Sequence, residues 1–102
     1  MKTKNLFRTF AFTLLLSAIT YPATYFVDNA RPDDSGSGLS WALAKKTISA
    51  AIGVSAAGDT ILVKDGTYTG ELNRNIQLNK TIILRSENGP TNCIIDCQSE
   101  CD

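Results

Sequence analysis

The architecture is best read from residues 57–68, which run Ala57-Gly58-Asp59-Thr60-Ile61-Leu62-Val63-Lys64-Asp65-Gly66-Thr67-Tyr68. Apolar and β-branched residues alternate here until an Asp-Gly pair, a pattern that predicts a short strand, a turn and a second strand. A similar unit follows at residues 79–89, which run Asn79-Lys80-Thr81-Ile82-Ile83-Leu84-Arg85-Ser86-Glu87-Asn88-Gly89. Short strands that return at one interval are typical of a chain that winds and stacks on itself.

The spacing of the apolar residues also predicts how these strands pair. Ile82 and Leu84 follow Ile61 and Val63 at one common spacing of 21 residues. We therefore expect parallel strands, with Ile61 stacked under Ile82 and Val63 under Leu84 in a continuous apolar row.

The remaining elements are predicted from local patterns. The β-branched and aromatic run Thr24–Asp28 predicts a first strand. Ile76–Leu78 predicts a short alternating strand, and residues 93–97 predict a last strand that follows it at nearly the same interval as the other repeat. Apolar residues at helical spacing predict a helix over Trp41–Ala56, capped by Ser40.

Several motifs occur in an order that resembles a known family. They are Tyr25-Phe26-Val27-Asp28, Asp34-Ser35-Gly36-Ser37-Gly38-Leu39-Ser40-Trp41-Ala42, Lys46-Thr47-Ile48-Ser49-Ala50-Ala51-Ile52, Ala57-Gly58-Asp59-Thr60-Ile61-Leu62-Val63, Asp65-Gly66-Thr67-Tyr68, Thr81-Ile82-Ile83-Leu84-Arg85-Ser86 and Ile94-Ile95-Asp96-Cys97. Together they resemble the N-terminal region of secreted right-handed parallel β-helix proteins, the pectin-lyase-like superfamily. The resemblance implies a mainly β fold, with an N-terminal capping helix plus the first two coils of a right-handed parallel β-helix. It also implies that catalytic groups lie on later coils, so that this chain is a truncated member.

The N-terminus has the pattern of a secretory signal peptide. Lys2, Lys4 and Arg8 precede an apolar run at 10–19, which is shorter than the roughly 20 residues that span a bilayer. We expect a signal peptide over 1–23, cleaved near Ala23, and a domain over 24–102. An uncleaved N-terminal anchor is the alternative. The prediction is a secreted, extracellular or cell-surface protein that has no membrane contact after cleavage.

The charge balance excludes some partners. The chain has 10 basic and 10 acidic residues, and three of the basic ones precede the predicted cleavage site. The mature part is therefore mildly acidic and contains no basic cluster, which argues against nucleic acid as a partner.

Acidic residues near the start of the domain suggest a weak metal site. Asp28, Asp33 and Asp34 lie beside Ser35 and Ser37, and carboxylate and hydroxyl oxygens suit Ca²⁺. The spacing does not match an EF-hand loop. The alternative is a solvated turn in which these side chains bond their own backbone, and apart from this possible Ca²⁺ we expect no cofactor.

No complete catalytic site is predicted. The chain contains no His, which is the commonest general base, and none of the familiar nucleophile or phosphate-loop motifs occurs. Lys64 and Arg85 fall at matching positions of the predicted repeat and could lie side by side against an acidic sugar, although solvated strand-edge charges are the simpler interpretation.

Three cysteines follow at intervals of four residues: Cys93, Cys97 and Cys101. Positions four apart on an extended strand are separated by about 13 Å, beyond the reach of a disulfide. A Cys97–Cys101 bridge is easier, because the intervening residues can form a loop. One cysteine of the three is left without a partner in the chain.

These patterns favour an exported, non-catalytic segment that binds polysaccharide or a cell-surface component in the intact protein. One alternative is an N-terminal fragment of a polysaccharide lyase or glycoside hydrolase whose active site lies on missing coils. The other is a small structural or adhesive module that associates edge to edge with itself through its last strands.

Overall fold

A computed structural model describes residues 21–98 of the chain. Most of the predicted signal peptide, including Lys2, Lys4 and Arg8, lies outside the described residues, as does Cys101. Among the described residues, no helix has the length and apolar character needed to span a membrane.

The described chain forms five short strands, one α-helix and two 3₁₀ turns. In order they are β1 (Thr24–Val27), η1 (Trp41–Leu43), α2 (Ile48–Val54), β2 (Thr60–Val63), β3 (Gly66–Tyr68), η2 (Glu71–Asn73), β4 (Ile83–Ser86) and β5 (Cys93–Ile95). One sheet has three strands in the order β1-β2-β4, and the other has two, β3-β5. All of these pairs are parallel, and the apolar spacing had predicted parallel pairing for β2 and β4.

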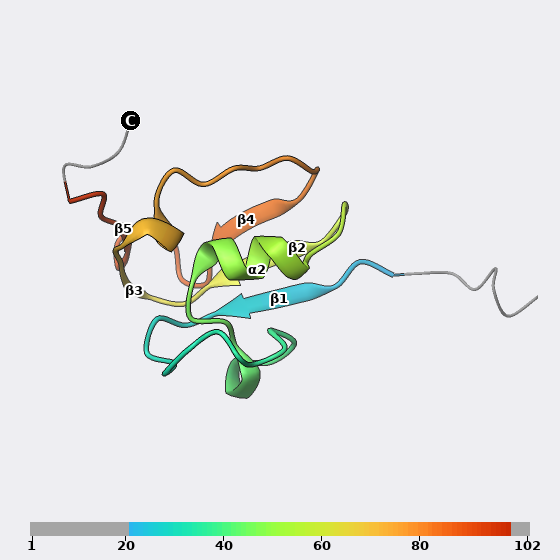
Figure 1. Ribbon diagram of the computed structural model, residues 1–102, viewed down its shortest axis with the longest axis horizontal. Helices are drawn as coiled ribbons and strands as arrows, with labels where there is room; N and C mark the ends of the chain where they lie inside the picture. The colour runs from blue at the N-terminus through green and yellow to red at the C-terminus, as the bar shows by residue number, and fades with distance from the viewer. Residues whose placement is uncertain (1–20, 99–102) are drawn as a thin grey trace, which may run out of the picture.

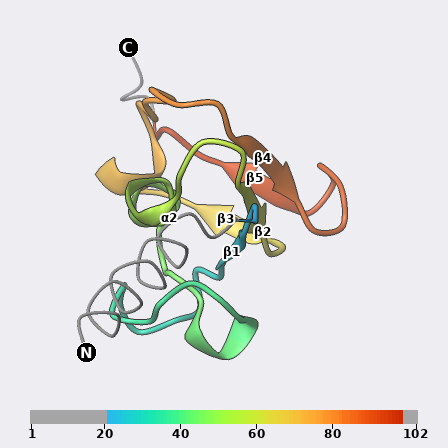
Figure 2. The ribbon, with the colours of Figure 1, turned by 90° about the vertical axis from the view of Figure 1, so that its right-hand side faces the viewer.

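The three-stranded sheet presents one face to α2, and that face carries the core. Figure 2 looks nearly along the strands and shows β1, β2 and β4 stacked in layers with α2 beside them. Ile61 and Val63 of β2 are buried, as their alternation predicted, and Ile48 of α2 packs against them. Tyr68 of β3 completes this cluster with its side chain fully buried.

The predicted fold class, a capping helix plus two coils of a right-handed parallel β-helix, is wrong for this chain. Residues 21–98 form a small mixed fold with two small parallel sheets and no solenoid. Thr24 pairs with Thr60, 36 residues later, but Thr60 pairs with Ile83 after only 23. The interval between paired strands is therefore not constant, whereas a solenoid requires a nearly constant repeat.

The predicted strand at Ile76–Leu78 is also absent. Residues 74–82 run as an irregular segment from η2 to β4 and pass alongside α2 (Figure 1). As a result, the last strand, β5, pairs with β3 rather than with a strand at 76–78.

The predicted register between the second and third layers is wrong by two residues. Ile61 pairs with Leu84, not Ile82, and Val63 pairs with Ser86. Hydrogen bonds at both ends fix this register, because Gly58 N donates to Thr81 O (2.7 Å) and Glu87 N donates to Val63 O (2.8 Å). A two-residue shift keeps the same side chains facing inward, so alternation alone cannot detect it.

The predicted helix over Trp41–Ala56 is interrupted. Ser40 does cap a helical turn, since its hydroxyl accepts from Leu43 N, but that turn is η1 and ends at Leu43. Ala44 is extended, and Lys45 forms a parallel bridge with Val27 at the edge of β1. Pairing with the sheet thus replaces helical hydrogen bonds over 44–46, and Thr47 caps a shorter helix.

Candidate binding groove

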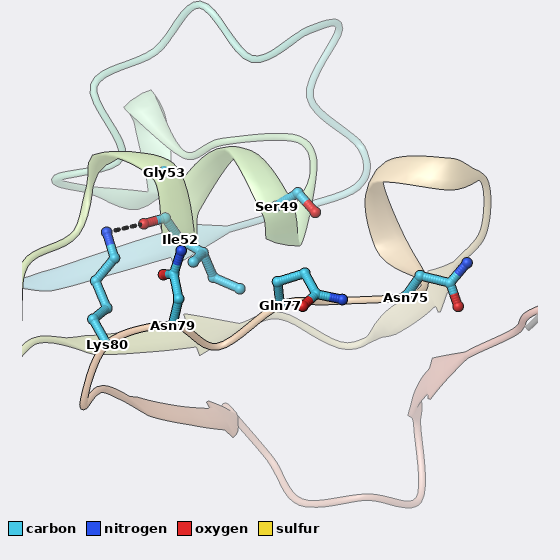
Figure 3. Close-up of a pocket in the computed structure, with 7 residues that line it drawn as sticks. All are labelled: Ser49, Ile52, Gly53, Asn75, Gln77, Asn79 and Lys80. Carbon is cyan, nitrogen blue, oxygen red and sulfur yellow. Dashed lines mark hydrogen bonds between the residues drawn. The ribbon is translucent and has the colours of Figure 1, made fainter. Parts of the chain in front are cut away.

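A polar hollow lies between α2 and the irregular segment that follows η2 (Figure 3). Its volume is about 400 Å³. The helix supplies one wall and the segment supplies the other, and the lining residues are Ser49, Ile52, Gly53, Asn75, Gln77, Asn79 and Lys80.

Buried Asn73 holds the start of this segment against the helix. Its Oδ1 accepts from Ile48 N (2.8 Å), which is an otherwise unpaired amide at the start of α2, and its Nδ2 donates to Thr69 O (2.9 Å). Ile76 packs against the core a little further along. The segment therefore keeps a fixed position although it contains no regular secondary structure.

Lys80 fixes the other end of the groove. Its Nζ donates to Ile52 O (3.0 Å) and to Ser55 O (2.7 Å), the carbonyls at the C-terminal end of α2. A cation at this position also interacts favourably with the helix dipole. Lys80 therefore ties the end of α2 to the segment and leaves little of its hydrogen-bonding capacity for a ligand.

The open part of the groove is rich in amide groups. Asn75, Gln77 and Asn79 recur at every second residue, and all three are exposed. Within residues 21–98, the side chains of Gln77 and Asn79 have no hydrogen-bond partner. An amide offers both donors and acceptors. Gly53 leaves open space at the helical wall, because a Cβ built there meets no atom within 4 Å.

A second, more apolar hollow lies at the C-terminal end of the core. It has a volume of about 230 Å³ and is lined by Ile48, Val63, Leu84, Arg85, Ser86, Cys93 and Ile95. It marks where the sheet and β5 diverge and the core is incompletely filled.

The weak calcium candidates are occupied by local hydrogen bonds. Asp28 accepts from Ala30 N (2.9 Å), and Asp33 accepts from both the N and the Oγ of Ser35 (3.0 and 2.6 Å). The Ser35 bonds lower the pKa of the Asp33 carboxyl.

Asp34 has a structural partner instead. Its carboxylate accepts from Lys46 N (2.6 Å) and from Thr47 N and Oγ1 (2.8 and 3.0 Å). Across residues 21–98, no three acidic or thiol side chains gather as a metal site would require.

Two further acidic residues, Asp59 and Asp65, accept hydrogen bonds at turns. Asp59 accepts from Ala23 N and Ala56 N (both 2.8 Å), and these bonds lower the pKa of its carboxyl. Asp65 Oδ2 accepts from Asn88 Nδ2 (3.3 Å), which links the two turns that follow β2 and β4.

Lys64 and Arg85 do not lie side by side, so the row of two cations, the less favoured interpretation of their spacing, does not form. Arg85 pairs with Leu62 in the sheet, so Lys64 lies beyond it. Lys64 Nζ lies 3.8 Å from Asp28 Oδ2 and 5.3 Å from the ring centroid of Trp41. Trp41 in turn packs edge-on against Phe26, with ring centroids 4.7 Å apart.

The cysteines fall into two states. Cys97 is disulfide-bonded, whereas Cys93 is free and its pKa is raised by burial. Cys101 lies outside the described residues, so the Cys97–Cys101 pairing stays a prediction.

No sequence motif had singled out the groove residues. The alternation of Asn75, Gln77 and Asn79 was the available signal, but amides at every second position are also common in loops. No protein-family model matches this sequence, and no significant match is found among curated proteins or solved structures.

Proposed function

We propose that this chain is an exported, non-catalytic module that binds polysaccharide in the groove between α2 and residues 74–80. The observation that carries the proposal is the run of alternating amide residues along the segment opposite α2, of which Asn79 extends towards the helix and Asn75 points away from it (Figure 3). Ligand sites combine apolar surface with a few polar groups that fix orientation. Gly53 leaves open space beside the largely buried Ile52, and Gln77 and Asn79 supply donors and acceptors for sugar hydroxyls.

The composition of the groove favours binding over reaction. Glycoside hydrolysis needs two carboxylates that flank one bond, and the residues that line this groove include no Asp, Glu or Cys. The single cation, Lys80, is engaged by two carbonyl groups. The groove is therefore matched to an uncharged sugar more closely than to an acidic one.

The test is a depletion assay with insoluble polysaccharides, using the chain expressed from its full sequence and recovered as the cell processes it. Cellulose and chitin serve as uncharged probes, and pectin gel serves as the acidic probe. We expect binding to at least one uncharged probe and weaker binding to pectin.

A matched pair of variants separates the groove from other surfaces. Gly53→Leu fills the groove from the helical wall without touching the core, since there is open space around Gly53. It should weaken binding at least about tenfold, whereas Gly53→Ala should bind like the parent. Gln77→Ala should weaken binding, and Asn92→Ala, which removes an exposed amide elsewhere, should not.

The proposal fails if no probe is retained. It also fails if Gly53→Leu binds as well as Gly53→Ala, because the sugar would then occupy another surface.

A further inference from the structure

The two edges of the three-stranded sheet differ in whether the chain itself covers them. At the β1 edge, Phe26 N donates to Gly38 O (2.7 Å), Lys45 N to Phe26 O (2.9 Å) and Asp28 N to Lys45 O (2.8 Å). Residues 38–45 thus close that edge. In the described part of the chain, no strand pairs with the outer edge of β4. Figure 2 shows β4 as the last layer of the stack, on the side away from β1.

The backbone of β4 alternates between β2 and this open edge. Ile83 N donates to Asp59 O (3.0 Å) and Glu87 N donates to Val63 O (2.8 Å), so the odd-numbered amides point to the β2 side. Successive amides of a strand point to opposite sides, and the backbone groups of Leu84 and Ser86 therefore point outward. Such a row is a template for another strand.

Three apolar side chains are exposed in β4 and β5. Ile83 of β4 is 57% exposed, and Ile94 and Ile95 of β5 are 48% and 45% exposed. Thr60 of β2, which pairs with Ile83 and lies on the same face of the sheet, is only partly exposed. Exposed apolar residues beside an unpaired strand edge indicate a surface that is covered in the working protein.

We propose that the β4 edge pairs with the β4 edge of a second copy of this chain, antiparallel about a two-fold axis at Leu84. A second copy cannot add head to tail, because residues 38–45 occupy its β1 edge. The remaining way to extend the sheet with this strand is a self-complementary, two-fold contact.

The backbone alternation and the side-chain charges together fix the position of the axis. Arg85 on the axis would form a non-hydrogen-bonded pair with its own copy, in which side chains lie closest, and would place two like charges opposite each other. Ser86 on the axis would require pairing beyond the end of β4 at Ser86. With Leu84 on the axis, Ile83 lies opposite Arg85 of the second copy, and the aliphatic part of that Arg85 covers Ile83. This contact occurs twice in each dimer.

The test is sedimentation equilibrium of the chain expressed from its full sequence and recovered as the cell processes it. We expect a reversible monomer–dimer equilibrium. Ile83→Lys places like charges opposite each other twice and should raise the dimer dissociation constant at least about tenfold. Ile83→Glu removes the same apolar side chain but places a carboxylate opposite Arg85, and should retain the dimer.

A charge exchange then tests the register. Adding Arg85→Glu to Ile83→Lys should restore association, because Lys and Glu then lie opposite each other. Far-UV circular dichroism at concentrations where the parent is monomeric checks that each variant is folded, and a non-reducing gel identifies any dimer linked through Cys93.

A parent chain that sediments as a monomer at every concentration overturns the proposal. Equal weakening by Ile83→Lys and Ile83→Glu, or no effect of either, also overturns it. No polysaccharide is present in this measurement, so its outcome is independent of the groove.

Discussion

The first and last layers of this small protein use the same backbone pairing but differ in what covers them. The β1 layer is closed at its outer edge by residues 38–45, and its side chain Val27 is fully buried. The β4 layer has an open edge, and Leu84, which lies on the same face of the sheet as Val27, is partly exposed. Parallel pairing alone therefore does not create a core here. Burial depends on a second element that packs over each layer, and the chain supplies one chiefly on the N-terminal side.

The largest effect on stability should come from truncating paired apolar side chains in a covered layer, β2, and in the open layer, β4. Ile61→Ala deletes a fully buried side chain between the sheet and α2 and should lower the free energy of unfolding by about 3 kcal/mol. Leu84→Ala, at the paired position in β4, should cost roughly half as much, because Leu84 is already partly exposed. Urea unfolding of both variants measures the difference. Equal losses would show that the two layers are equally well packed.

The loop that closes the β1 edge offers the next comparison. Asp34→Ala leaves the amides of Lys46 and Thr47 without their acceptor, and should lower the free energy of unfolding by about 2 kcal/mol. Asp33→Ala removes a carboxylate that bonds only to nearby Ser35 and should have a much smaller effect. Thermal unfolding compares the two variants. If Asp33→Ala were the more damaging change, Asp34 would not be what anchors the loop to the helix.

Tyr68 connects the two sheets and gives this region a dependence on alkaline pH. Its hydroxyl donates to Lys64 O (2.8 Å), and burial raises its pKa from 10.0 to about 12. The unfolded phenol ionises first, so the stability due to Tyr68 is complete below pH 10 and is lost as the pH rises towards 12.

Tyr68→Phe should cost about 1 kcal/mol at neutral pH, and the gap between parent and variant should narrow above pH 10. Urea unfolding at a series of pH values measures this gap. A constant gap would mean that the Tyr68 hydroxyl ionises equally easily in both states.

The smallest expected effect is a gain. Gly53→Ala adds a methyl group to α2 in open space and should raise the free energy of unfolding by about 0.5–1 kcal/mol, through the better helix propensity of alanine. Thermal unfolding measures it. A loss instead would show that the wall of the groove does not tolerate even a methyl group.

Local patterns in the sequence predicted the elements whose form depends on neighbouring residues. The alternation of Ile61 and Val63 correctly predicted a strand with one buried face. The Asp-Gly pair at 65–66 predicted a turn, and the chain turns there between β2 and β3, with a φ of 152° at Gly66. In these cases the determining interactions lie within a few residues of each other.

Interactions between distant residues could not be read in the same way. The helix predicted from Trp41 breaks because Lys45 pairs with Phe26 and Asp28, which nothing in its own neighbourhood indicates. The groove depends on the contact between Lys80 and the end of α2, 25 residues or more away along the chain. The apparent repeat was also misleading, because equal spacing of apolar residues does not require equal spacing of paired strands.

Because Lys80 joins the end of α2 to the groove, a bound ligand should also stabilise that end of the helix. The ammonium group holds the last helical carbonyls and also one end of the groove. Fraying of the helix terminus must therefore release the lysine and widen the groove at the same moment. We expect occupancy of the groove to slow amide hydrogen exchange in the last turn of α2, which turns that helix end into a built-in reporter of binding.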